Sequence, residues 1–313
     1  VSAVIVFFLP LTGCAAPRGE TFPARSLVPV ASVTPALASP VATTLPAPRE
    51  FHLHLNGIGG YRGVDRGMIR GLRDGGYAGE VKAYDWTGDD VGLAALTVKR
   101  RHKEQSAAIA QILIDQARAH PGSRITITTH SAGAGIIVWA LAQLPRDITI
   151  DTLVFLAPAL SPTYDLTPAL RHVSGKAYVF YSPYDAAVLG MGTTMFGTVD
   201  GVKTEASGKV GFQRPATADA EQYAKIVQFP YRTSWVKLGN IGDHIGVMRR
   251  AFAREVLAPL LVRGSVTPRL GGGNVDDDDV DDDSLMTPPA FETVPATNPS
   301  AGHPASATPA PVP

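Results

Sequence analysis

The sequence is poor in cysteine and has no excess of charge of either sign, and these absences exclude some common classes of protein. Its 313 residues include a single cysteine, Cys14, so no disulfide can form within the chain. Lys plus Arg total 28 and Asp plus Glu total 28, which gives a formal net charge of zero. No basic stripe carries interleaved aromatic residues. These absences give no electrostatic reason to expect nucleic acid as a partner, and we exclude that class.

Apolar runs long enough to span a bilayer are also missing near the N-terminus. Residues 4–11 read VIVFFLPL, which is too short for a transmembrane helix and has the length of a signal-peptide core. The run leads into Leu11-Thr12-Gly13-Cys14, which resembles the lipobox of bacterial lipoproteins. The resemblance implies cleavage before Cys14 and acylation of that cysteine. We therefore expect a signal peptide over residues 1–13 and an exported protein, held at the membrane of the cell envelope by Cys14. The alternatives are an ordinary signal cleaved near residues 36–38 and a buried strand.

The two ends of the chain have compositions that cannot bury a patterned face. Residues 14–48 are dense in Pro, Ala, Ser and Thr, and we expect a tether there. Residues 263–313 carry an acidic block at 276–283 and then a Pro-rich tail, and we expect this part to be disordered. The acidic block lacks the central glycine and closing glutamate of a calcium loop. We expect no metal site and no cofactor.

The middle of the chain, residues 49–262, alternates strand and helix patterns. Helices are expected at 64–72, at 133–144 and from about 247 to 260, and a further long helix is expected to end at about residue 120. Strands are expected at 51–55, 81–86, 124–129, 152–157 and 177–181. Such alternation predicts an α/β fold with a mostly parallel central sheet flanked by helices. In such sheets reactive groups gather at the carboxyl ends of the strands.

One serine follows the most β-branched of these strands. Strand 124–129 runs directly into His130-Ser131-Ala132-Gly133, and a helix begins at once. This resembles the nucleophile elbow of the α/β-hydrolase superfamily, Gly-x-Ser-x-Gly, with Thr129 in place of the first glycine. The resemblance implies the α/β-hydrolase fold, with Ser131 as nucleophile. The alternative is a serine that only caps the helix.

A base and an acid are found downstream in the order that the family uses, serine, acid, histidine. Asp185 follows strand 177–181, where the resemblance implies the orienting acid, and Asp165 and Asp243 are the rivals. His244 lies in a glycine-rich turn before the last amphipathic helix, and we expect it to be the general base. Asp243 beside it is interpreted as a helix N-cap.

Acyl transfer also needs donors for the developing oxyanion. The resemblance implies the backbone N–H of Ala132 as one donor. The other is expected in the loop Asn56-Gly57-Ile58-Gly59-Gly60, where Ile58 is preferred and Gly57 or Gly59 are rivals. A plain glycine turn is the alternative.

The substrate is the least determined part of the prediction. Trp86, Tyr164 and Tyr184 follow strands and are expected to line a pocket, while residues 186–223 form either a lid or a simple excursion. Without a cationic clamp, a small-molecule or lipid carboxylic ester is the expected substrate. The sequence thus predicts a serine esterase or lipase-like enzyme. The alternatives are a thioesterase, peptidase or acyltransferase of the same fold, and a catalytically silent surface lipoprotein that binds a ligand.

Overall fold

The computed structural model describes residues 50–89, 91–185, 198–262 and 293–294. The expected signal peptide, the tether with Cys14 and almost all of the acidic tail lie outside the described residues. So do residues 186–197 of the segment that was expected to be a lid or an excursion.

The centre of the molecule is a six-stranded sheet with the strand order β2-β1-β3-β4-β5-β7. Every neighbouring pair of strands is parallel, which confirms the predicted fold class. The strands are β1 (Glu50–Leu55), β2 (Glu80–Tyr84), β3 (Arg124–His130), β4 (Ile150–Leu156), β5 (Val173–Tyr181) and β7 (Ile226–Pro230). A further two-residue pair joins β6 (Arg214–Pro215) to β8 (Thr293–Val294).

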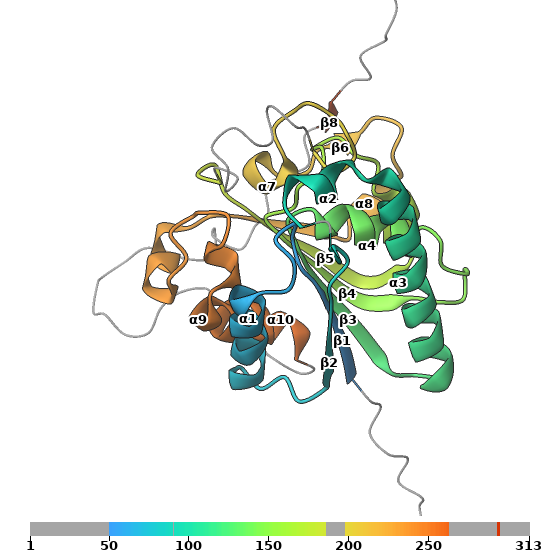
Figure 1. The fold of residues 1–313 in the computed structure, drawn as a ribbon, viewed down its shortest axis with the longest axis horizontal. Helices are drawn as coiled ribbons and strands as arrows, with labels where there is room; N and C mark the ends of the chain where they lie inside the picture. Colours follow the sequence, from blue (N-terminus) through green and yellow to red (C-terminus); the bar gives the residue numbers. More distant parts are fainter. Residues whose placement is uncertain (1–49, 90, 186–197, 263–292, 295–313) are drawn as a thin grey trace, which may run out of the picture. The chain divides into compact units, whose positions relative to one another are not determined.

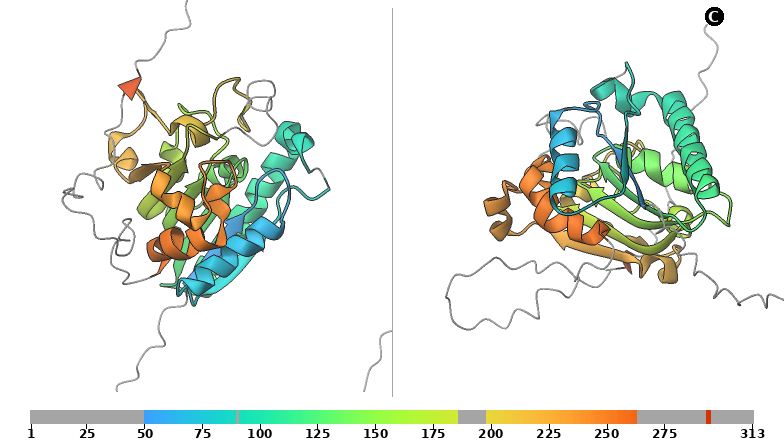
Figure 2. Two further views of the ribbon diagram at one scale, coloured as in Figure 1. Left: turned by 90° about the vertical axis from the view of Figure 1, so that its left-hand side faces the viewer. Right: turned by 90° about the horizontal axis from the view of Figure 1, so that it is seen from below.

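Helices cover both faces of this sheet, as Figures 1 and 2 show. One face carries α1, α9 and α10, and the other carries α3 and α4. The helices are α1 (Gly63–Asp74), α2 (Leu93–Thr97), α3 (Lys99–Ala119), α4 (Gly133–Leu141), α5 (Thr167–Leu170), α7 (Ser207–Val210), α8 (Ala220–Tyr223), α9 (Arg250–Phe252) and α10 (Ala258–Leu261). Within the described ranges, none of the helices has the length and apolarity needed to cross a membrane.

Two apolar clusters form the core, one on each face of the sheet. Ile125 and Ile127 of β3 point into the cluster under α3 and α4. The second cluster packs α1 against the C-terminal helices, and Gly71 allows the close approach, because a Cβ there would lie 2.3 Å from the carbonyl oxygen of Arg250. The expected C-terminal helix is present but irregular, with a 3-10 turn at Gly246–Met248 and a π-helical turn at Ala253–Leu257 between α9 and α10.

Candidate active site

Ser131 occupies a strained turn between β3 and α4. Its φ is +53°, in the left-handed region that residues with a Cβ seldom adopt. Ser131 keeps this conformation because its carbonyl oxygen accepts hydrogen bonds from the N–H groups of Ala134 and Ala159. Gly133 is required beside it, since a Cβ there would lie 2.6 Å from the carbonyl oxygen of Asn56. The backbone therefore turns Ser131 out of the strand at the carboxyl edge of the sheet.

Thr129, where the elbow pattern has its first glycine, fits without displacing the turn. The side chain is fully buried, and its Oγ1 lies 2.8 Å from the place of a Cβ on Gly133. Among the described residues Oγ1 has no hydrogen-bond partner. The substitution of threonine for glycine is thus accommodated by the glycine at position 133.

Asp185 and His244 are brought together by two different loops. The Nδ1–H of His244 donates to the Asp185 carboxylate, at 2.9 Å from Oδ1 and 3.1 Å from Oδ2. Asp185 is 9% exposed and is held in a turn after β5 by a hydrogen bond from its N–H to the carbonyl of Ser182. Because Nδ1 carries the hydrogen, Nε2 of His244 is left as the proton acceptor.

The two other aspartates considered for the acid have different roles. Asp165 is exposed, and its Oδ1 accepts a hydrogen bond from the N–H of Thr167, which stabilises the turn before α5. Asp243 lies in the turn with His244, where its carbonyl oxygen accepts from the N–H of Gly246. Its side-chain Oδ1 has no hydrogen-bond partner among the described residues, so it does not cap the helix as expected. Of the three, only Asp185 has a carboxylate that contacts the His244 ring.

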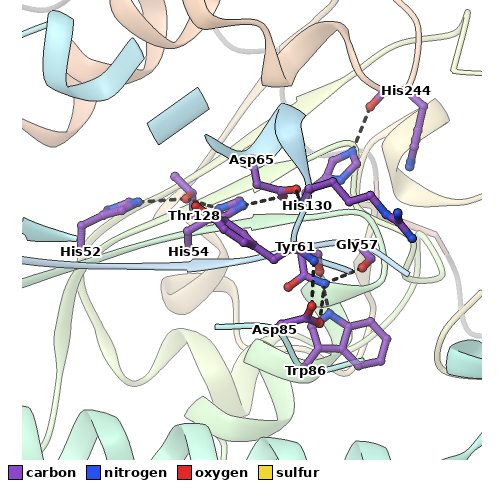
Figure 3. A network of polar contacts seen from close by, with 12 residues as sticks. His52, His54, Gly57, Tyr61, Asp65, Asp85, Trp86, Thr128, His130 and His244 are labelled. Atoms are coloured by element: carbon purple, nitrogen blue, oxygen red, sulfur yellow. Dashed lines mark hydrogen bonds and ion pairs between the residues drawn. The ribbon is translucent and has the colours of Figure 1, made fainter. Parts of the chain in front are cut away.

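His130 connects the serine elbow to the histidine loop, a role that the sequence did not indicate. It directly precedes Ser131, and its Nε2–H donates to the carbonyl oxygen of His244 at 3.0 Å. The two imidazole rings lie 4.8 Å apart between centroids (Figure 3). Burial, with a further contribution from His244, lowers the pKa of His130 to about 3, so this ring is neutral at neutral pH.

The expected oxyanion loop lies against Ser131. A Cβ on Gly57 would come within 3.0 Å of the Ser131 Cβ, so the backbone of the loop approaches the serine as closely as a glycine allows. The carbonyl oxygen of Ile58 accepts from the N–H of Gly92 at 2.6 Å, which ties the loop to the segment before α2. Ala132, the other expected donor, is fully buried at the start of α4.

Asp85 holds this loop from the neighbouring strand end (Figure 3). Its carboxylate accepts hydrogen bonds from the N–H of Tyr61 at 2.8 Å, from the Asn56 amide at 3.3 Å, and from the N–H and hydroxyl of Thr87 at 3.0 and 2.6 Å. Partial desolvation raises the pKa of the Asp85 carboxyl, but these hydrogen bonds outweigh it and keep the pKa below its usual value. Both ends of the loop are thus fixed by one carboxylate.

The three aromatic residues expected to line a pocket lie in different environments. Trp86 is fully buried and donates its Nε1–H to the carbonyl oxygen of Asn56 at 2.6 Å, so it supports the loop from behind. Tyr164 is half-buried, and its hydroxyl accepts from Nε1–H of Trp139. Tyr184 is 66% exposed beside Asp185 and packs edge-on against Tyr231. Tyr184 is therefore the one of the three that is most open to a substrate.

No protein-family model and no curated protein matches this chain. Lipase B of Aspergillus fumigatus matches 69% of this chain over 53% of its own length, with 16% identity and a TM-score of 0.42. A dienelactone hydrolase of Anabaena variabilis matches 69% of the chain over 84% of its length, with 15% identity and a TM-score of 0.39. A lipase-esterase related protein of Clostridium acetobutylicum matches 68% of the chain over 94% of its own length, with 10% identity and a TM-score of 0.38.

Proposed function

We propose that this chain is a serine hydrolase of the α/β-hydrolase type that cleaves carboxylic esters through an acyl-enzyme. The observation that carries the proposal is the hydrogen bond of 2.9 Å from His244 to Asp185, in a loop that contacts His130, the residue before Ser131, whose φ is +53°. A buried carboxylate that orients one ring nitrogen of a histidine next to a strained serine is the arrangement that activates a hydroxyl.

In the proposed first stage, Oγ of Ser131 attacks the carbonyl carbon of the ester and its proton moves to Nε2 of His244. The Asp185 carboxylate stabilises the imidazolium that forms. The electron pair of the broken C=O π bond moves onto oxygen, where the N–H groups of Ala132 and Ile58 are the proposed donors. Collapse of this intermediate expels the alcohol, which takes the proton from His244.

In the second stage, water replaces the alcohol. His244 takes a proton from the water as its oxygen attacks the acyl carbon, and the proton is then given to Oγ of Ser131 as the acid leaves. A thioester or amide would follow the same steps with a different leaving group. We prefer an ester because no feature of the described residues selects a thiol or an amine. Export and anchoring through Cys14 belong to the same proposal and depend on residues outside the described ranges.

The test is labelling of the purified chain with a fluorophosphonate, in which the serine oxygen displaces fluoride from phosphorus. We expect labelling of the wild type and none of Ser131→Ala or His244→Ala. Asp185→Asn should reduce ester hydrolysis by about 10²- to 10⁴-fold, because the histidine loses its orienting carboxylate. Asp165→Asn is the matched control, and it should hydrolyse p-nitrophenyl esters at the wild-type rate.

Different results would select the alternatives. A folded wild-type chain that is not labelled would refute the hydrolase and favour the binding lipoprotein. Labelling combined with a higher kcat/KM on thioesters than on oxygen esters of the same acyl chain would favour the thioesterase.

A further inference from the structure

We propose that His130 is a positioning residue that holds the backbone of the His244 loop on the strand that carries Ser131. The inference deepens the proposed function and rests on it. A base that takes a proton from a serine must be kept at a constant distance from that hydroxyl. His130 is the residue that joins the two elements concerned.

The contact is directional and spans a long stretch of chain. Nε2 of His130 lies 3.0 Å from the backbone oxygen of His244, across 114 positions of sequence. A carbonyl oxygen can only accept, so Nε2 of His130 carries the hydrogen. Figure 3 shows the ring of His130 directed from the end of β3 toward this oxygen. The hydrogen bond therefore ties the loop to the residue before the nucleophile.

His130 itself has little freedom to move. It is 7% exposed and is the last residue of β3, where it is paired with Leu156 of β4. Its Nδ1 lies 3.1 Å from the place of a Cβ on Gly57, in the expected oxyanion loop. Because the ring is enclosed by these neighbours, it is fixed relative to β3, and it therefore holds the loop that it contacts at a fixed place relative to this strand.

The other hydrogen bonds of this loop are mostly local, while Val247 and Met248 beyond it pack into the second core cluster. The N–H of Gly242 donates to Oδ1 of Asn240 at 3.0 Å, and the N–H of Gly246 donates to the carbonyl of Asp243 at 3.1 Å. These shape the turn without fixing its distance from Ser131. Asp185 holds the side chain of His244 from the end of β5, and His130 holds its backbone from the end of β3. The histidine is thus anchored from two strands of the sheet.

A neutral ring at this place also suits the reaction. His244 becomes an imidazolium when it accepts the serine proton, and the His130 ring lies 4.8 Å away. Burial lowers the pKa of His130 to about 3, so no second positive charge opposes that step at neutral pH. His130 therefore supplies a donor to the loop at no electrostatic cost to the base.

The test compares variants with and without a donor at the same reach. His130→Gln keeps an N–H near the place of Nε2, His130→Asn places its N–H about one bond short, and His130→Leu has none. For ester hydrolysis we expect kcat to fall about 10- to 100-fold in the Leu and Asn variants with KM within about threefold, because the base is displaced. His130→Gln should recover most of kcat.

Fluorophosphonate labelling separates positioning from folding. The labelled fraction counts correctly folded sites, and the labelling rate reports how well the base and the serine are placed. We expect a wild-type fraction and a lower rate in His130→Asn. A reduced fraction that labels at the wild-type rate, or equal losses of kcat in the Gln and Asn variants, would overturn the positioning role. Failure of the proposed function is a different result, in which the wild type is not labelled.

Discussion

A buried histidine on β1 should make the stability of this protein depend steeply on pH. His52 is fully buried, with its Nδ1 and Nε2 each 2.9 Å from a threonine hydroxyl, those of Thr126 and Thr128 respectively. Burial, with smaller contributions from His54 and Arg73 nearby, lowers the pKa of His52 from the ordinary value of 6.5 to about 3. The folded protein therefore keeps this ring neutral over a pH range in which the unfolded chain protonates it.

The direction of the effect follows from proton uptake. As the pH falls below 6.5, the unfolded state binds a proton at His52 that the folded state does not bind until about pH 3. The unfolded state is thereby stabilised by about 1.4 kcal/mol for each pH unit in this window. At pH 5 the contribution is about 2 kcal/mol, a large share of the roughly 5–15 kcal/mol by which a domain is stable. Stability is full above pH 6.5 and is lost on acidification.

The assay is urea unfolding followed by tryptophan fluorescence at pH 7.5 and at pH 5. His52→Gln loses contacts at both pH values. Its free energy of unfolding should nevertheless fall by about 2 kcal/mol less than that of the wild type between pH 7.5 and pH 5. Thr126→Val is the control, because it removes a hydrogen bond to His52 and keeps the titrating ring. It should be destabilised by a similar amount at both pH values. The reasoning is refuted if the wild type and His52→Gln lose the same stability between pH 7.5 and pH 5.

Three further substitutions test the elbow and the loop. Gly133→Ala places a methyl group 2.6 Å from the Asn56 carbonyl oxygen and should destabilise the fold by about 1–3 kcal/mol, measured by urea unfolding. Ser131→Gly relieves the positive φ and should stabilise the fold by about 1 kcal/mol while labelling is lost; an unchanged unfolding midpoint would contradict the strain. Asp85→Asn removes an acceptor from the end of the oxyanion loop and should lower kcat about tenfold. Substitution of the exposed Asp89 by Asn is the control. A wild-type kcat in Asp85→Asn would show that the loop holds its shape without the carboxylate.

Most of the sheet could be predicted from sequence because its inner strands are short β-branched runs that end in turn residues. β3 and β4 have this pattern and were placed within two residues of their observed bounds. The edge strand β7 was not predicted; it is a run of five residues that ends at Pro230, a residue that is depleted in strands.

The site residues that sequence could indicate share one property, which is a place at the end of a predicted element. Ser131, Asp185 and His244 each stand in a turn that follows a strand or precedes a helix. His130 also stands at the end of a predicted strand, but its role depends on a carbonyl 114 residues away that only the fold brings near. Asp85 was missed for a related reason, since its partners lie in a loop that belongs to another strand.

The polar residues of β1 show that alternation alone does not tell whether one face of a strand is solvated. His52 and His54 alternate with apolar residues, a pattern that suits a strand with one solvated face. In a parallel sheet covered on both sides they are fully buried instead, and each must find partners. The register of β1 on β3 supplies them, since His52 lies opposite Thr126 and His54 lies opposite Thr128. Asp65 of α1 then accepts a hydrogen bond from Nε2 of His54 at 3.0 Å and completes the series of hydrogen bonds shown in Figure 3.

This register also explains the direction of His130. Thr126, Thr128 and His130 are alternate residues of one strand, so their side chains leave β3 on the same face. The first two satisfy the buried histidines of β1, and the third reaches the loop of His244. A slip of one residue in β3 would turn all three to the opposite face. The polar pairs between β1 and β3 thus keep His130 aimed at the base, which places the support of the site in the core of the sheet.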